Sequence, residues 1–231
     1  KDVVPKPLND LKPNRNLYGD RGWCRAEVEW SSLRTVNLQH QRICPVDADE
    51  VQSGDGMSCR VPMTPQKFET TMKDSKFTHK ADSETVIFLQ SKVFTEKVSA
   101  CESLVLEGVP PAEMVALTQV LPFYKCLKSL KLSNFECNEE VAMAFGEALA
   151  RSKVESLQLQ PQNKDSGWFM GKAIVKVVDL NSALTFINPE YHTFFVKEDA
   201  KVVMEALRSK AYSTARLPFD APVRLQALAT A

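Results

Sequence analysis

A six-residue pattern, apolar-x-Ser-Leu-x-Leu, occurs three times in the middle of this chain and constrains its fold more than any other feature. The copies begin at Cys101, Leu127 and Val154, so they are spaced by 26 and then 27 residues. Apolar residues at helical spacing lie between them, in residues 111–121 and 138–152. A strand and a helix that alternate at a fixed period predict an α/β fold.

The repeated pattern resembles leucine-rich repeats, and most closely the ribonuclease-inhibitor type, over residues 101–162. The resemblance implies a strand on the concave face and a helix on the convex face of each repeat. That family places Asn or Cys three residues after the last leucine of the strand. This chain has Val109, Phe135 and Gln162 there, so we expect its turns to be held in another way.

The strands of the repeat offer a candidate binding face. We expect six side chains to point outward, away from the paired leucines: Ser103, Val105, Ser129, Lys131, Ser156 and Gln158. Such a surface is small, mixed and hydrophilic, which suits contact with a protein better than a small-molecule pocket. The alternative is an ordinary sheet face exposed to solvent.

The repeat leads to a division of the chain into four regions. We expect an extended arm at residues 1–22, a helical region at 23–100, the leucine-rich-repeat-like array at 101–162, and a small α/β extension with a tail at 163–231. A short array buries its apolar faces only against neighbours, so it needs a cap at each end. The flanking regions are the candidates for those caps.

The region before residue 100 is predicted to be helical apart from one loop. Residues 23–38 have helical spacing, and a long loop follows at 44–66. Thr64 is suited to cap a helix that has Pro65 at its first position, and another helix is expected after Asp82. The face of the first helix expected to be buried carries four residues: Trp23, Ala26, Trp30 and Leu33.

The region after residue 163 shows no repeat. Residues 173–178 and 184–187 are strand-like, and residues 197–211 are predicted to form a helix with an apolar stripe. The last residues, after Leu217, carry prolines and are predicted to form a tail that lies on a surface.

The first helix also contains the pattern W-C-x-x-E, formed by Trp23, Cys24 and Glu27. It resembles the second half of Toll/interleukin-1 receptor (TIR) domains, within a stretch similar to protist multidomain proteins that join a TIR-like module to leucine-rich repeats. In the NAD-cleaving members the glutamate is catalytic, so the resemblance implies that role for Glu27, where a carboxylate would stabilise an oxocarbenium-like transition state. Too few residues precede Trp23 for the strands that such a domain needs first. We therefore favour a packing role for this helix.

Composition narrows the classes of function. With 29 basic and 29 acidic side chains, the chain lacks the charge excess that drives nucleic-acid binding. Its apolar runs are too short for a transmembrane helix. Its 6 cysteines and 3 histidines lack the close pairing of metal ligands, so we expect no metal and no cofactor. Scattered thiols favour a soluble, intracellular protein in a reducing compartment, either cytoplasmic or organellar.

Taken together, the residues predict a non-catalytic scaffold or protein–protein interaction protein. We expect other protein subunits as partners and the role of a peripheral accessory subunit, since an arm and a tail can wrap over a neighbour. The protist resemblance extends this to an organellar or even photosynthetic assembly, at the periphery of a membrane complex. The alternative is a TIR-like NAD glycohydrolase or signalling module that uses Glu27.

Overall fold

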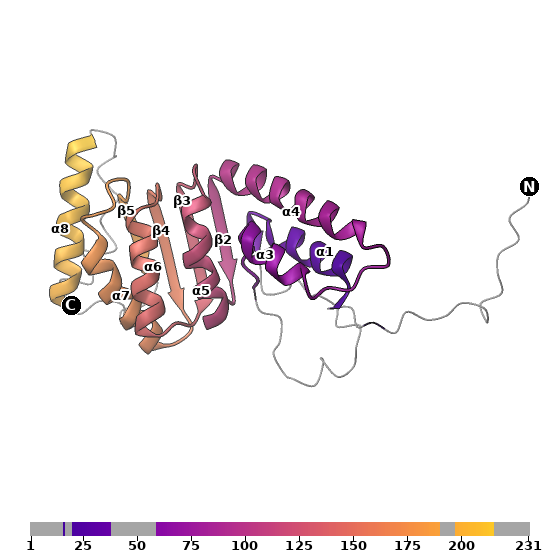
Figure 1. Cartoon of the computed structure of the whole chain (residues 1–231). Coiled ribbons are helices and arrows are strands. Elements are labelled where there is room, and N and C mark those ends of the chain that lie inside the picture. Colours follow the sequence, from indigo (N-terminus) through magenta and orange to yellow (C-terminus); the bar gives the residue numbers. More distant parts are fainter. Residues whose placement is uncertain (1–15, 17–19, 38–58, 190–196, 215–231) are drawn as a thin grey trace, which may run out of the picture.

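The computed structural model describes residue 16 and residues 20–37, 59–189 and 197–214 (Figure 1). The predicted tail after Leu217 and nearly all of the predicted arm lie outside these residues, as does most of the predicted loop at 44–66. Among the described residues, no helix combines the length and the apolar character needed to cross a membrane.

The centre of the molecule is one parallel sheet whose strands follow the order of the chain, β1-β2-β3-β4-β5. Each crossover therefore leads to the neighbouring strand. The strands are β1 (Val36–Asn37), β2 (Ser103–Glu107), β3 (Ser129–Phe135), β4 (Ser156–Pro161) and β5 (Phe186–Pro189).

Four helices form a layer beside the strands (Figure 1). They are α5 (Pro111–Val120), α6 (Glu139–Ala150), α7 (Lys164–Val177) and α8 (Lys197–Thr214), and a short 3-10 turn, η3 (Leu121–Phe123), follows α5. Asn138 caps α6 as predicted, and Asn163 caps α7, each accepting a hydrogen bond from a backbone N–H of the first turn. This alternation of strand and helix confirms the predicted α/β class.

The leucines of the repeat align across the sheet and form its buried side. Leu104, Leu130 and Leu157 are in register, and Leu106, Leu132 and Leu159 form a second row two residues on. All of them are buried in the main apolar cluster, which also contains residues of the helix layer. Removing these rows from water is the main favourable contribution to the fold of the array.

The strands of the array begin with the same backbone arrangement, which identifies β5 as a further copy. The carbonyl oxygen of Glu102 accepts from the N–H groups of Lys128 and Ser129. The carbonyl oxygens of Lys128 and Glu155 do the same for the next two strand entries. The strand predicted at 184–187 is thus shifted to Phe186–Pro189, and β5 takes the place of a fourth repeat without carrying the Ser-Leu-x-Leu sequence.

The turns after the strands are held by the backbone. Gly108 and Asn134 occupy equivalent positions and both have positive φ, 71° and 52°, a conformation that Gly and Asn adopt most easily. Beyond them, Glu136 N donates to Val109 O at 3.0 Å, and Gln162 N donates to Phe135 O at 2.9 Å. Backbone pairing therefore satisfies the turns in which leucine-rich repeats use Asn or Cys.

The strand predicted at 173–178 is wrong, because these residues lie in and just after α7. Ala173, Ile174 and Val177 are buried, with Met170 one turn earlier. This is the spacing of one helix face packed on the sheet. The short β-branched run alone does not distinguish a strand from such a buried helix.

The region before the array forms a smaller helical cluster from α1 (Gly22–Ser32), α3 (Pro65–Met72) and α4 (Ala81–Ala100). The predicted cap of α3 is confirmed, since Thr64 accepts a hydrogen bond from Lys67 N with Pro65 at the first position. The second predicted helix, α4, begins at Ala81 and runs over α1 to the edge of the sheet (Figure 1). Its last turns carry Phe94 and Val98 into the core of the array.

The first helix differs from its prediction in length and in the place of Trp23, whereas Ala26 is buried and both Trp30 and Leu33 pack against the apolar clusters as predicted. It ends at Ser32 instead of residue 38, because the chain then enters β1. Trp23 is 41% exposed, so it is not the expected core anchor. The residues that α1 buries are Gly22, Ala26, Glu29 and Ser32.

Candidate functional site

The six residues predicted to form a binding face lie together on the sheet. Ser103, Ser129 and Ser156 are partners across β2, β3 and β4. Val105, Lys131 and Gln158 form the next outward row, and their side chains alternate with the buried leucines. We call these two rows, with their extensions below, the outer sheet face.

The outer sheet face is wider than the sequence indicated. The row of Lys131 continues to Val36 on β1 and to Asn188 on β5, so it crosses all five strands. The serine row ends at Phe186. Sequence reasoning missed these additions because β1 and β5 lack the repeat pattern.

The outer sheet face mixes polar side chains with Val36, Val105 and Phe186 and carries little charge. Lys131 is the one cation among the six predicted residues, and its side chain is half-buried between neighbouring strands. At the entry of the strands, Lys128 and Glu102 form an exposed ion pair at 3.5 Å. Exposed pairs of this kind contribute little to stability.

Glu27 lies elsewhere, exposed on α1. The tryptophan of the W-C-x-x-E pattern has a structural contact, because Trp23 Nε1 donates to a carboxylate oxygen of Asp82 at 3.1 Å. This hydrogen bond joins α1 to the first turn of α4.

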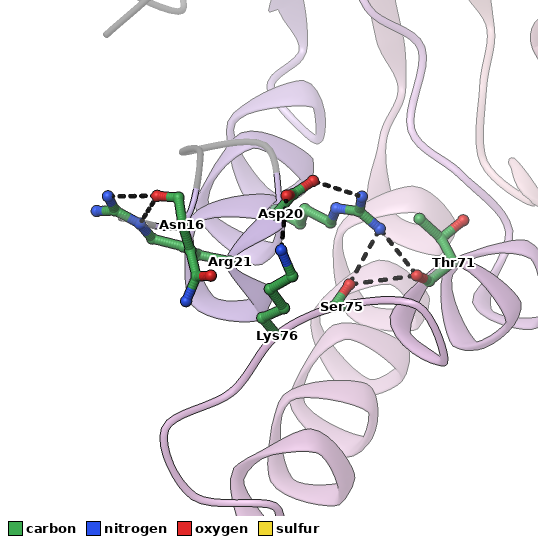
Figure 2. Close-up of polar contacts among 7 residues, drawn as sticks. Asn16, Asp20, Arg21, Thr71, Ser75 and Lys76 are labelled. Carbon is green, nitrogen blue, oxygen red and sulfur yellow. Dashed lines mark hydrogen bonds and ion pairs between the residues drawn. The ribbon is translucent and has the colours of Figure 1, made fainter. Parts of the chain in front are cut away.

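Around the start of α1, polar side chains hold this helix to the last turn of α3 and to the chain that follows it (Figure 2). Arg25 donates to the carbonyl oxygen of Thr71 at 3.0 Å and to Ser75 Oγ at 3.1 Å. Lys76 pairs with Asp20 at 3.2 Å. The backbones meet as well, since Gly22 N donates to Lys76 O and Lys76 N donates to Asp20 O. These contacts serve the packing of α1.

The buried carboxyl of this region is Glu29, which sequence reasoning missed. Its side chain is 2% exposed, and its Oε1 accepts from Met63 N at 2.5 Å and from Gln90 Nε2 at 3.4 Å. Burial raises the pKa of Glu29 to about 7, against the hydrogen bond from Met63, which lowers it. The sequence feature that could have indicated its burial is the stripe of small residues Gly22 and Ala26, which Glu29 continues at helical spacing.

Glu29 is one of two carboxylates that hold residues 59–63. In this connecting segment, Cys59 N donates to Gly108 O at 2.9 Å, and Val61 N donates to Glu113 Oε2 at 2.7 Å. With Met63 N on Glu29, alternate backbone N–H groups are bound by the turn after β2, by α5 and by α1. The connecting segment therefore joins the array to the helical cluster.

The buried thiols are poorly suited to nucleophilic chemistry. Burial raises the pKa of Cys59 to about 12 and that of Cys137 to about 11, and it raises the pKa of Cys101 as well. The thiolate is the reactive form, so these side chains act as small apolar core residues. In the part of the chain that the structure describes, no three His, Cys, Asp or Glu side chains form a group that could hold a metal ion.

The sequence matches no protein-family model and no curated protein. The resemblances to leucine-rich repeats and to TIR-like domains therefore stay predictions from the residues. A functional assignment has to be built on the geometry of the outer sheet face and of the helical cluster.

Proposed function

We propose that this protein is a non-catalytic interaction or scaffold protein that binds a partner protein through its outer sheet face. The observation that carries the proposal is the outward row centred on Lys131, which crosses five parallel strands. Side chains aligned in this way give a continuous surface with little charge, apolar at Val36 and Val105 and polar from Lys131 to Asn188. Another folded protein fits such a surface better than a small ligand does, because small ligands require concave, largely apolar sites.

The size of the face bears on the kind of binding. The strands contain 2, 5, 7, 6 and 4 residues. At about 3.3 Å per residue and about 4.8 Å between strands, one whole face of the sheet covers roughly 400 Å². A standard protein interface buries about 800 Å² on each partner. A stable contact must therefore extend beyond the sheet, which is how an accessory subunit with additional contacting segments would bind.

The finer parts of the proposal depend on the sequence. A peripheral accessory subunit of a larger assembly, organellar or photosynthetic, follows from the protist resemblance and from the predicted arm and tail. A reducing compartment is consistent with the free cysteines among the described residues, of which Cys59, Cys101 and Cys137 are buried.

The test compares partner recovery by three forms of the protein. The native chain, Lys131→Glu and Lys176→Glu are tagged, purified from the source cells and analysed by mass spectrometry. Lys176 is exposed on α7, in the helix layer, so it controls for the reversal of charge. We expect stoichiometric partners with the native chain and with Lys176→Glu, and their loss with Lys131→Glu. Equal recovery by all three forms, or no stable partner of the native chain, would contradict the proposal.

A further inference from the structure

We propose that Glu29 and Gln90 form a latch that holds the connecting segment against α1 and α4, closed when Glu29 carries a proton and opened when it loses it. Such a latch would control conformation independently of the outer sheet face. The two side chains lie at the junction between the helical cluster and the array.

The two side chains present an excess of buried acceptors. Glu29 Oε1 has two donors, but Glu29 Oε2 and Gln90 Oε1 have no hydrogen-bond partner among the described residues. Both residues are almost fully buried, at 2% and 0% exposed. A carboxylate can only accept, so the amide of Gln90 must present its Nε2 to Glu29, and this leaves its oxygen without a donor.

A proton on Glu29 Oε2 removes this mismatch. The neutral carboxyl would donate from Oε2 to Gln90 Oε1 while Oε1 continues to accept from Gln90 Nε2, as in a cyclic acid–amide pair. The proton comes from water, and no other bond is made or broken. Buried polar groups without partners are costly, so the neutral form is the one that fits the closed junction.

The charged groups around Glu29 have opposite effects on its pKa. Arg60 of the connecting segment and Lys67 of α3 favour the ionised form, whereas Glu113 of α5 favours the neutral form. Tyr124, after η3, also lies within electrostatic reach, and its own pKa is raised by burial. The group that α4 presents to the carboxyl is the neutral amide of Gln90. Desolvation by burial has the largest effect on the pKa of Glu29 and raises it to about 7.

Ionisation is expected to release one end of the connecting segment. The hydrogen bond from Met63 by itself favours the ionised carboxylate, but the cost of desolvation exceeds it. An opening that hydrates Glu29 and releases Met63 is therefore more favourable when Glu29 is ionised. Cys59 and Val61 keep their separate acceptors, Gly108 O and Glu113. The opening should therefore be local to Met63 and the start of α3.

The test measures amide hydrogen exchange at Met63 between pH 5.5 and 8.5, corrected for the intrinsic pH dependence of exchange. With the pKa of Glu29 at about 7 when folded and 4.5 when exposed, local opening should increase roughly 30-fold over this range. Glu29→Gln imitates the neutral acid and should abolish the increase. Glu27→Gln, an exposed position on the same helix, should retain it.

Two further measurements test the latch. The carboxyl carbon shift of Glu29, followed by NMR in the native protein, should titrate with a midpoint near 7. This measurement tests the protonation of Glu29 even if Glu29→Gln does not fold. Gln90→Met should increase exchange at Met63 at pH 5.5, because it removes the partner of the neutral acid. The latch is refuted by a Glu29 midpoint near 4.5, by an unchanged pH dependence in Glu29→Gln, or by no effect of Gln90→Met.

Discussion

The array and the helical cluster bury their side chains in different ways. In the array, rows of leucines repeat from strand to strand, and the backbone satisfies the turns. In the helical cluster, a few apolar residues surround a polar junction. Of the described residues, the buried side-chain atoms without a hydrogen-bond partner are on Glu29, Trp30 and Gln90, which belong to α1 and α4.

We expect the array to provide most of the stability of the fold and the helical cluster to provide its sensitivity to pH. A repeated core spreads its stabilisation over many equivalent contacts, as in other stacked arrays. The helical cluster has a smaller apolar core and adds single polar contacts such as Met63 with Glu29 and Arg25 with Ser75. Because α4 contributes Val86 to one core and Phe94 to the other, a change in one region should still be felt in the other.

The largest effect is expected from the core of the array. Leu130→Ala, on the central strand β3 and fully buried, should lower the free energy of unfolding by about 3 kcal/mol through lost burial and a cavity. The measurement is urea unfolding followed by circular dichroism. Leu180→Ala is the matched control, since Leu180 is 68% exposed and should change the value by less than about 0.5 kcal/mol. Equal losses for both would show that the leucine rows do not dominate.

The pH dependence of the free energy of unfolding should show the contribution of the helical cluster, which contains Glu29. Since the pKa of Glu29 is raised to about 7 in the folded state, its contribution to stability is complete below 4.5 and is lost as pH rises through 7. The loss is about 3 kcal/mol at most. It is measured as the difference in unfolding free energy between the native chain and Glu29→Gln from pH 5 to 8. A difference that does not change with pH would contradict the raised pKa.

A pair of glycine substitutions compares how tightly the regions are packed. A Cβ at Gly22 would come within 1.9 Å of the ring of Phe77, whereas one at Gly146 would meet Ala173 at 3.3 Å. Gly22→Ala should therefore cost about 1–3 kcal/mol through overpacking. In Gly146→Ala, the gain in helix propensity of about 1 kcal/mol offsets the tight contact. Thermal unfolding of both variants is the measurement, and a larger loss from Gly146→Ala would reverse the comparison.

The smallest effect is expected at Glu27. Because its side chain is exposed on α1, Glu27→Gln should change the unfolding free energy by less than about 0.5 kcal/mol. In an assay of NAD consumption, we expect the native chain and Glu27→Gln to behave alike. NAD cleavage by the native chain that is lost in Glu27→Gln would instead support the alternative TIR-like function.

The sequence predicted the array better than the helical cluster. The positions of Leu104 and Leu130, and of Ser103 and Lys131 on the opposite side, follow from alternation along each strand and from the fixed period. Local pattern is sufficient there, because each copy packs against another copy of itself. The strand entry at Phe186 was displaced, since only the backbone pairing with Glu155 identifies it.

For the helical cluster, the sequence determined that a helix forms near Trp23, but the tertiary structure decided which of its faces is buried. Ala26 and Trp30 pack in the cluster as the sequence indicated. Trp23 is exposed, and contact with Phe77 and α4 encloses Gly22 and Glu29 instead. Periodicity is a property of the chain itself. The choice of buried face depends on the shapes of neighbours that come from distant parts of the sequence, and the same choice places a carboxyl in a site that changes its proton affinity.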